Sequence, residues 1–154
     1  MRNVLEKVTK NDFEEVNALA RDVQRQHVNY RPDIFKDVKY PIPKDYFNSL
    51  LNDGSLFVYR REGEIIAYIV LLMKEKNVES MHKNKTLLLE QLTVKQLMRG
   101  KGIGTEIMNE VMRYAKENSC ASIELTVSPE NKEAIKFYEQ FGMRVKNIKY
   151  SITV

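Results

Sequence analysis

The clearest sign of a functional site is a loop rich in glycine and basic residues, 99–104. It lies between a segment with the pattern of a strand and one with the pattern of a helix. Gly100, Gly102 and Gly104 leave their backbone amides unshielded by side chains. The helix that follows contributes its free N–H groups and a partial positive charge, and Arg99 and Lys101 add full positive charges. This combination predicts a binding site for a phosphorylated ligand, most simply a pyrophosphate.

The spacing of the glycines separates the known phosphate-binding motifs. A Walker loop requires Gly-x-x-x-x-Gly-Lys-Ser/Thr, which is absent here. A dinucleotide-binding fingerprint needs a third glycine where Thr105 or Ile107 stands. The loop does match Arg/Gln-x-x-Gly-x-Gly/Ala through Arg99, Gly102 and Gly104. In this form it resembles the acyl-CoA pyrophosphate loop of the GNAT superfamily of N-acetyltransferases, the alternative being a glycine-rich turn without a ligand.

A second motif follows one predicted β-α-β unit downstream. Residues 123–127 alternate as in a strand, and the next segment has the pattern of a helix closed by Gly142. It resembles the other GNAT signature, N-x-x-A-x-x-F-Y-x-x-x-G-F, in Asn131, Tyr138 and Gly142, with Met143 in the last position. Taken alone, its apolar residues could be a core stripe, but both motifs in this order favour the family. The resemblance is tight over residues 85–146.

The composition limits the classes of protein that the chain can belong to. Its 154 residues predict one domain, 1–154, that buries about two-thirds of its unfolded surface. The single Cys120 excludes an internal disulfide and suits a reducing compartment. The first residues show no apolar segment typical of a secretory signal, and the longest apolar run, 65–73, is too short to cross a bilayer. We therefore expect a cytoplasmic protein that does not contact membranes.

The net charge of +4 raises the question of nucleic-acid binding. Lysines and arginines are scattered, with local density at 74–85 and 144–149, and no basic motif interleaved with aromatic residues is present. A protein whose cosubstrate carries several phosphate groups also gains from positive charge. We therefore expect no nucleic-acid partner.

The periodicity of the sequence predicts the elements that would position the two motifs. The predicted strands are 4–8, 55–60, 64–74, 86–94, 121–127 and a pair within 143–154, and the predicted helices are 11–31, 45–51, 103–117 and 131–140. The turn at 61–63 makes a hairpin of its neighbours, whereas a helix joins 86–94 to 121–127 and makes that pair parallel. The fold class is therefore α/β, a single domain with a mixed sheet flanked by helices, and the resemblance implies that the two parallel strands splay apart.

The resemblance also implies how the residues are used. The backbone of Leu92–Val94 pairs with the pantetheine amides, the loop amides bind the pyrophosphate, and Tyr138 acts as the general acid. Acetyl-CoA is the implied cosubstrate, and no metal is expected. The implied cofactor-binding residues are Leu92, Thr93, Val94, Arg99, Gly100, Lys101, Gly102, Ile103, Gly104, Thr105 and Asn131.

The general base is not identified by these motifs. Some members that acetylate peptide N-termini carry glutamate at the position of Thr126, so the chain departs from that subgroup. Glu90, on the cofactor-binding strand, is the leading candidate, and Glu124, His27 and bulk water remain open. The need for a base depends on the acceptor, since deprotonating a lysine-like ammonium at neutral pH costs roughly 4 kcal/mol and a peptide α-amine under roughly 1 kcal/mol.

The predicted function is therefore acetyl-CoA-dependent N-acetylation of a primary amine, belonging to a small molecule or to a peptide or protein. A thioester is already activated, so a covalent role for Cys120 is not needed. The alternative function is a GNAT-like module that binds acyl-CoA without turnover. The sequence leaves the acceptor and the oligomeric state open, a homodimer included.

Overall fold

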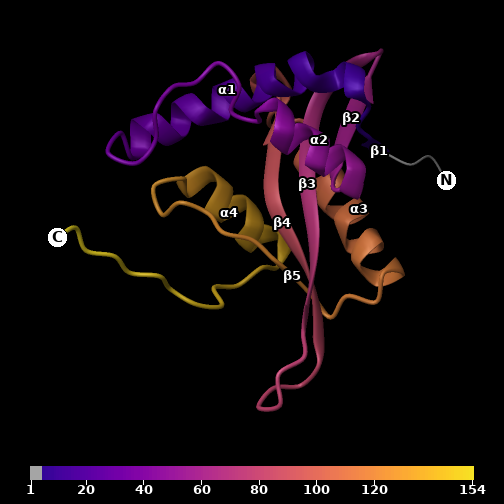
Figure 1. The fold of residues 1–154 in the computed structure, drawn as a ribbon, viewed down its shortest axis with the longest axis vertical. Helices are drawn as coiled ribbons and strands as arrows, with labels where there is room; N and C mark the ends of the chain where they lie inside the picture. The colour runs from indigo at the N-terminus through magenta and orange to yellow at the C-terminus, as the bar shows by residue number, and fades with distance from the viewer. Residues whose placement is uncertain (1–4) are drawn as a thin grey trace.

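The computed structural model describes residues 5–154 and has a five-stranded mixed sheet at its centre (Figure 1). The strands are β1 Glu6–Lys7, β2 Leu56–Arg61, β3 Glu64–Lys76, β4 Asn84–Val94 and β5 Ser122–Glu124. They lie in the order β1-β2-β3-β4-β5; the first three pairings are antiparallel and the β4–β5 pairing is parallel. The predicted α/β class with a mixed sheet is confirmed. Val4, in the first predicted strand, lies outside the described residues.

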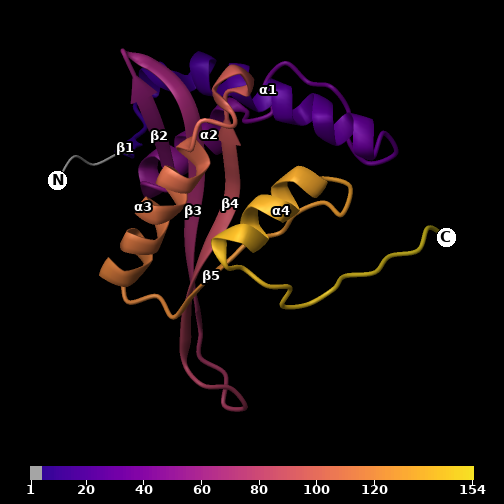
Figure 2. The same cartoon turned by 180° about the vertical axis from the view of Figure 1, so that it is seen from behind.

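Helices cover both faces of this sheet (Figures 1 and 2). The helices are α1 Phe13–Tyr30, α2 Lys44–Asp53, α3 Ile103–Glu117 and α4 Lys132–Phe141, with short 3-10 helices at Lys10–Asp12 and Gln96–Met98. The apolar residues of α1 and α2, Val16 and Phe47 among them, pack on one face. Those of α3 and α4, including Ile107 and Phe137, pack on the other. Because both faces are covered, β3 is buried continuously from Ile65 to Leu71.

The hairpin between β2 and β3 confirms the predicted turn. Its two connecting residues, Glu62 and Gly63, have φ angles of 54° and 82°, the left-handed values that a tight hairpin connection requires. The next connection is shorter than predicted. Strands β3 and β4 pair as far as Lys76 and Asn84, so that only residues 77–83 form the loop.

Asp12 stands at the N-terminal boundary of α1, but its side chain does not cap the helix. The carboxylate accepts hydrogen bonds from the Thr9 backbone N–H at 2.8 Å and the Arg60 guanidinium at 2.6 Å. Burial by itself raises the pKa of Asp12, but the hydrogen bonds from Arg60 and Thr9 outweigh it and lower that pKa overall. Asp12 therefore links the start of α1 to strand β2.

Asn17 on α1 holds the irregular segment that precedes α2. Its side chain is fully buried and donates to the carbonyls of Ile42 and Phe13, both at 3.0 Å, and accepts from the Ile42 N–H at 2.9 Å. Because the Ile42 backbone groups lie in an apolar environment, each needs this partner. The single amide thus fastens the end of this segment, at Ile42, to α1.

Replacing Asn17 by alanine is therefore expected to lower the free energy of unfolding by about 2–4 kcal/mol, because it leaves the Ile42 N–H and carbonyl buried without partners. Urea denaturation followed by circular dichroism measures the change. Asn29→Ala is the matched control, since Asn29 lies exposed on the same helix. It should change stability by less than about 0.5 kcal/mol. Equal stabilities of the two variants would contradict the role of Asn17.

The last part of the chain differs from the prediction. Residues 143–154 form no strand, although a strand pair was expected, and they extend away from the sheet (Figure 2). Strand β5 also covers only residues 122–124 of the predicted 121–127. A strand exists only where a neighbour completes its hydrogen bonds. In residues 5–154, β4 pairs with β5 only as far as Glu124, and no strand pairs with the outer edge of β5.

Candidate functional site

A β-bulge in β4 places Glu90 outside the regular ladder. On the β3 side, Val70 pairs with Gln91 and Leu71 with Leu89, so Glu90 has no partner residue. The bulge inverts the alternation of the strand. Before it, Leu89 faces the α3–α4 core; after it, Leu92 does. Glu90 is exposed and directly precedes the segment predicted to hold the pantetheine arm.

Strands β4 and β5 splay apart at the same point, as predicted. They pair only from Thr86 to Leu88 with Ser122 to Glu124. Beyond Leu88, the backbone of β4 bonds to β3 on one side, while on the other side no described strand accompanies it. The N–H and carbonyl groups along this edge of Leu92–Val94 can therefore pair with an extended ligand in the manner of an added strand.

The glycine loop closes one end of this gap. Gly100 and Gly102 have φ angles of 75° and 81°, and a Cβ built on either would meet no atom within 4 Å. Gly102 stands immediately before α3, in the left-handed conformation, so that the helix presents its free N–H groups there. Arg99 folds back on the strand, its Nε donating to the Val94 carbonyl at 3.1 Å. The loop is thus held to the end of β4.

Gly104 differs from the other two glycines. A Cβ built on it would lie 3.1 Å from the Cζ of Phe137 on α4. The sequence predicts that all three glycines keep the backbone open to a ligand. At position 104, packing is a second reason for glycine. Glycine at 104 allows the first turn of α3 to pack against the ring of Phe137. This contact brings the two sequence motifs together in space.

Helix α4 carries the other two predicted residues. Asn131 caps it, since Oδ1 accepts the Ala134 backbone N–H at 3.2 Å, so that the cap uses the amide oxygen and not the side-chain NH2. Tyr138 is half-buried against the core shared with Leu92 and Val94. Burial raises the pKa of Tyr138 to about 12, so its hydroxyl stays protonated across the physiological range.

The face of β4 opposite the α3–α4 core contributes residues that the motifs did not indicate. Gln91, next to Glu90, accepts a hydrogen bond from the Tyr68 hydroxyl at 2.9 Å. Tyr46 on α2 lies within electrostatic range of Glu90, and burial first, then Glu90, raises the pKa of Tyr46. Sequence motifs do not indicate this cluster, because Tyr46, Tyr68 and Glu90 are far apart along the chain.

The other candidate bases are engaged elsewhere. His27 packs on Phe35, with ring centroids 5.0 Å apart, and burial lowers its pKa, which keeps the imidazole neutral near pH 7. Glu124 forms an ion pair with Lys146. Cys120 follows α3 and donates its backbone N–H to the Ala115 carbonyl, an ordinary helix-end contact. Of the three residues considered as the base, Glu90, Glu124 and His27, only Glu90 stands at the bulge.

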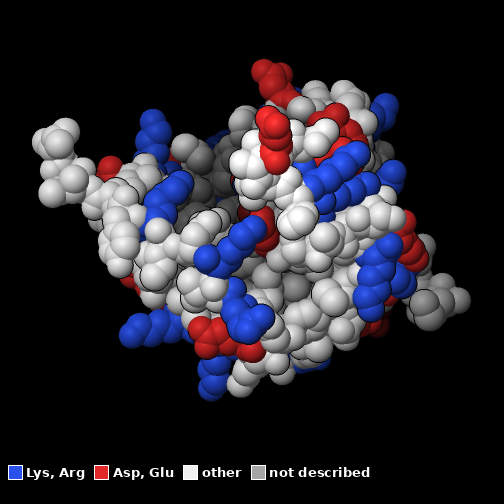
Figure 3. Space-filling view, turned by 90° about the horizontal axis from the view of Figure 1, so that it is seen from below, with Lys and Arg blue, Asp and Glu red and all other residues white. Residues whose placement is uncertain are grey.

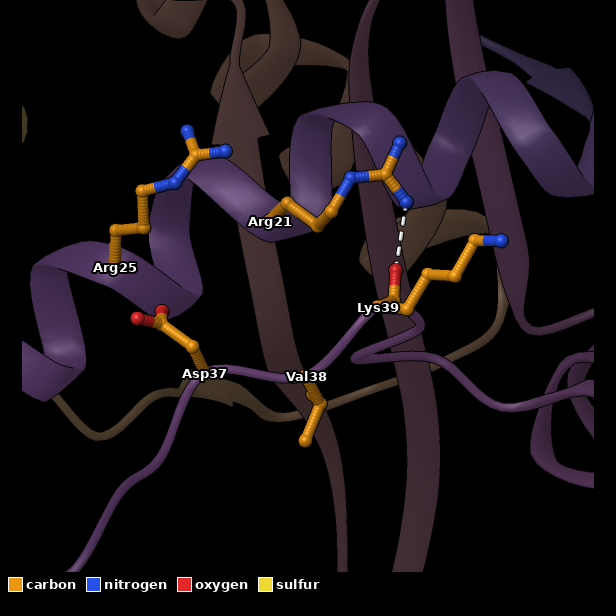
Figure 4. Close-up of a pocket in the computed structure, with 5 residues that line it drawn as sticks. All are labelled: Arg21, Arg25, Asp37, Val38 and Lys39. Atoms are coloured by element: carbon orange, nitrogen blue, oxygen red, sulfur yellow. Dashed lines mark hydrogen bonds between the residues drawn. The ribbon is translucent and has the colours of Figure 1, made fainter.

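A small hollow between α1 and residues 37–39 is separate from this gap (Figure 4). It has a volume of about 260 Å³, and its lining residues are Arg21, Arg25, Asp37, Val38 and Lys39. Arg21 donates to the Lys39 carbonyl at 2.6 Å, and Arg25 pairs with Asp22 on its own helix. Arg21 thus fastens the segment to α1, which is a structural role.

The surface charge is mixed. On the face shown in Figure 3, Lys and Arg side chains are interspersed with Asp and Glu side chains. Among residues 5–154, no helix is both long and apolar enough to span a membrane. No cluster of three or more His, Cys, Asp or Glu side chains suited to a metal ion occurs in that part of the chain.

Comparison with known proteins agrees with this geometry. An uncharacterised N-acetyltransferase of Methanocaldococcus jannaschii is 27% identical over 92% of this chain, which spans only 60% of that relative's length. The thialysine N-epsilon-acetyltransferase of Bos taurus is 35% identical over 63 residues, 41% of this chain and 37% of its own.

Solved structures show the same fold. The BH1408 protein of Bacillus halodurans, studied as a mutant, is 28% identical and superposes with a TM-score of 0.92, covering 97% of this chain and 98% of its own. An aminoglycoside N-acetyltransferase in complex with CoA has a TM-score of 0.67 at 17% identity. The match covers 97% of this chain and 93% of that protein. Residues 16–143 match the acetyltransferase (GNAT) family. The chain, with its glycine loop and splayed strands, therefore belongs to the GNAT family of acetyltransferases.

Proposed function

We propose that this protein is an N-acetyltransferase that uses acetyl-CoA to acetylate a primary amine of a small molecule, or of a peptide or protein. The observation that carries the proposal is the gap between β4 and β5 beside the glycine loop. It combines an unpaired strand edge for amides with a helix N-terminus for phosphates. Acetyl-CoA contains both groups and supplies an activated acyl thioester.

The residues present fit this cosubstrate. Gly100 and Gly102 leave open space that a side chain would fill, and the N–H groups of Ile103 and Thr105 lie in the first turn of α3. Lys101 adds positive charge at the same loop and is exposed. These groups would hold the pyrophosphate, the edge of Leu92–Val94 would hold the pantetheine amides, and Asn131 would donate to one of the arm's carbonyls.

Tyr138 would donate a hydrogen bond to the sulfur that leaves the acyl group. With a pKa of about 12, its phenol is present as the donor form at every pH at which the enzyme would work. The same high value makes complete transfer of the proton unfavourable without help from the bound ligand. Tyr138 thus acts by stabilising developing negative charge, and the final proton can come from water.

Glu90 would serve the acceptor amine. Glu90 stands at the bulge of β4, within electrostatic range of Tyr46 on α2. A carboxylate at this point attracts an ammonium group and then accepts its proton, directly or through a water molecule. Its effect should grow with the pKa of the acceptor, since a lysine-like amine is more costly to deprotonate than a peptide α-amine.

Release of free CoA thiol on addition of amines tests the proposed function, with mass spectrometry of the products. The panel should contain lysine and thialysine, an aminoglycoside and short peptides, because two similar proteins are an acetyltransferase of thialysine and one of aminoglycosides. Amine-dependent thiol release with an acetylated product supports the proposal. Binding of acetyl-CoA without turnover on any amine would instead support the non-catalytic module.

Replacing Glu90 by glutamine is expected to lower kcat about tenfold on a lysine-like acceptor and less on a peptide α-amine. Glutamine keeps the size of the side chain but cannot accept a proton, so the acidic limb of the pH–rate profile should also be lost. Glu124→Gln is the control, because Glu124 pairs with Lys146. A parental profile for the Glu90 variant on both acceptors would place the base elsewhere.

A further inference from the structure

Strand β4 carries a polar side chain, Gln91, directly after the bulge at Glu90. Gln91 pairs across the strands with Val70, which belongs to the core that β3 shares with α1 and α2. Residues directly opposite one another on antiparallel strands have their side chains on the same face of the sheet. Gln91 therefore lies on the α1–α2 face, where it is only half-buried.

A buried tyrosine binds the amide oxygen of Gln91. Tyr68 is 1% exposed, and its hydroxyl donates to Gln91 Oε1 at 2.9 Å. Burial raises the pKa of Tyr68 to about 12, and a hydrogen bond with the side chain of Thr93 lowers that pKa in part. A hydrogen bond that lowers the pKa of a hydroxyl is one that its oxygen accepts. Thr93 thus donates to Tyr68, and Tyr68 in turn donates to Gln91.

This chain of hydrogen bonds fixes the orientation of the Gln91 amide. Because the buried hydroxyl of Tyr68 holds Oε1, the NH2 group at the other corner of the amide is turned away from the core. Within residues 5–154, no group accepts a hydrogen bond from this NH2. A fixed, outward-facing NH2 group is suited to bind an oxygen atom of a ligand.

Glu90 supplies a negative charge close to this donor. The two residues are consecutive, so their Cα atoms lie about 3.8 Å apart. Tyr46 of α2 lies within electrostatic range of both Glu90 and Tyr68, so the carboxylate and the buried hydroxyl belong to one cluster. A carboxylate attracts an ammonium group, whereas an NH2 group donates to an oxygen. The two neighbouring residues therefore match a ligand whose amine nitrogen and oxygen are close together.

We propose that Gln91, held by Tyr68, selects acceptors with an N–C–C–O arrangement, in which Glu90 binds the amine and the Gln91 NH2 group binds the oxygen. This inference rests on the proposed N-acetyltransferase function and narrows its acceptor. Two classes of amine have this arrangement: α-amino carbonyl compounds, such as amino acids and peptide N-termini, and amino alcohols, such as amino sugars. Simple alkylamines lack it. Tyr68 is a positioning residue, because it acts through Gln91.

The preference between small acceptors, measured as a ratio of kcat/KM values, tests this selection. Glycinamide and ethanolamine carry the oxygen, one for each class, and propylamine has a carbon in its place. Gln91→Met keeps the length of the side chain but removes its N–H groups. The variant should lower the preference for glycinamide, for ethanolamine or for both over propylamine by about three- to tenfold, as expected for one neutral hydrogen bond. Which of the two ratios falls identifies the class of acceptor.

Tyr68→Phe tests the positioning role. Without the hydroxyl the Gln91 amide is free to turn, so the same ratio should fall, and adding Gln91→Met should lower it no further. Tyr59→Phe is the matched control, since Tyr59 is also buried and its hydroxyl donates to Glu106 at 3.2 Å. This control should lose stability but keep the parental ratio. A purely structural role of Tyr68 would slow the reaction of all three acceptors equally.

The outcomes separate this inference from the proposed function. A parent that releases no thiol with any amine would contradict the proposed function, and this inference with it. Three results overturn the inference while the proposed function stands: an unchanged ratio in Gln91→Met, turnover of other amines with none of the three small acceptors, and a parental ratio in Tyr68→Phe. The last of these removes the role of Tyr68 alone.

Discussion

Replacing Tyr138 by phenylalanine is expected to lower kcat by on the order of 100-fold while leaving the dissociation constant of acetyl-CoA nearly unchanged. The phenyl ring keeps its place against the apolar core, next to Phe137 at a centroid distance of 5.2 Å. Only the hydroxyl that we propose to face developing charge on the leaving sulfur is removed. Such a group acts in the transition state, so its loss appears in kcat and in kcat/KM alike.

Tyr114→Phe is the matched control for this variant. Tyr114 lies on the C-terminal half of α3 and packs against Phe57 of β2. It is also half-buried, and burial also raises its pKa. Removing its hydroxyl should change kcat less than twofold. The pH–rate profile gives a second readout, since a pKa of about 12 for Tyr138 predicts no basic limb from this group below about pH 10. Equal turnover of the parent and the Tyr138→Phe variant would show that Tyr138 has only a packing role in the core.

Replacing Gly102 by alanine is expected to weaken acetyl-CoA binding by on the order of 100-fold. The new Cβ meets no protein atom within 4 Å, so it points into the space beside the loop amides. A methyl group there prevents a pyrophosphate from forming one or two charge-assisted hydrogen bonds with the loop amides. Each such bond contributes about 1.5–3 kcal/mol to binding. The positive φ of 81° adds about 1–2 kcal/mol of backbone strain, which thermal unfolding reports separately from binding.

Gly63→Ala is the matched control for the loop variant. Gly63 has a φ of 82° and an equally open Cβ position, but it lies in the β2–β3 turn. Both variants should lose similar stability, and only Gly102→Ala should lose affinity in isothermal titration calorimetry. Gly104 is less suited to this test, because a Cβ there would press on the Phe137 ring. Unchanged affinity of a folded Gly102→Ala protein would move the pyrophosphate site away from this loop.

Much of this architecture could be predicted because its signals are local. The glycine loop, the helix after it and the Asn131 motif each lie in one short stretch of sequence, and the structure folds them as predicted. The parallel pairing of β4 with β5 also followed from local patterns, since a helix between two strands permits little else. Hydrophobic periodicity determined which faces of these elements are buried.

Other features depend on residues that are far apart in the chain. The bulge at Glu90 arises from the register of β4 against β3, which no stretch of β4 specifies alone. The cluster around it joins Tyr46 of α2 to Tyr68 of β3, and the reason for glycine at position 104 is the ring of Phe137. Such contacts exist only after the elements have packed.

The end of the chain shows the same division most clearly. The sequence by itself determined that residues 148–154 favour a strand, because alternation and β-branched side chains are local properties. Whether a strand forms is decided by tertiary structure, because backbone hydrogen bonds need a neighbour, and this segment leads away from its own sheet. Thus the local pattern determined the motifs and their elements, and long-range packing decided which side chains surround the gap between β4 and β5.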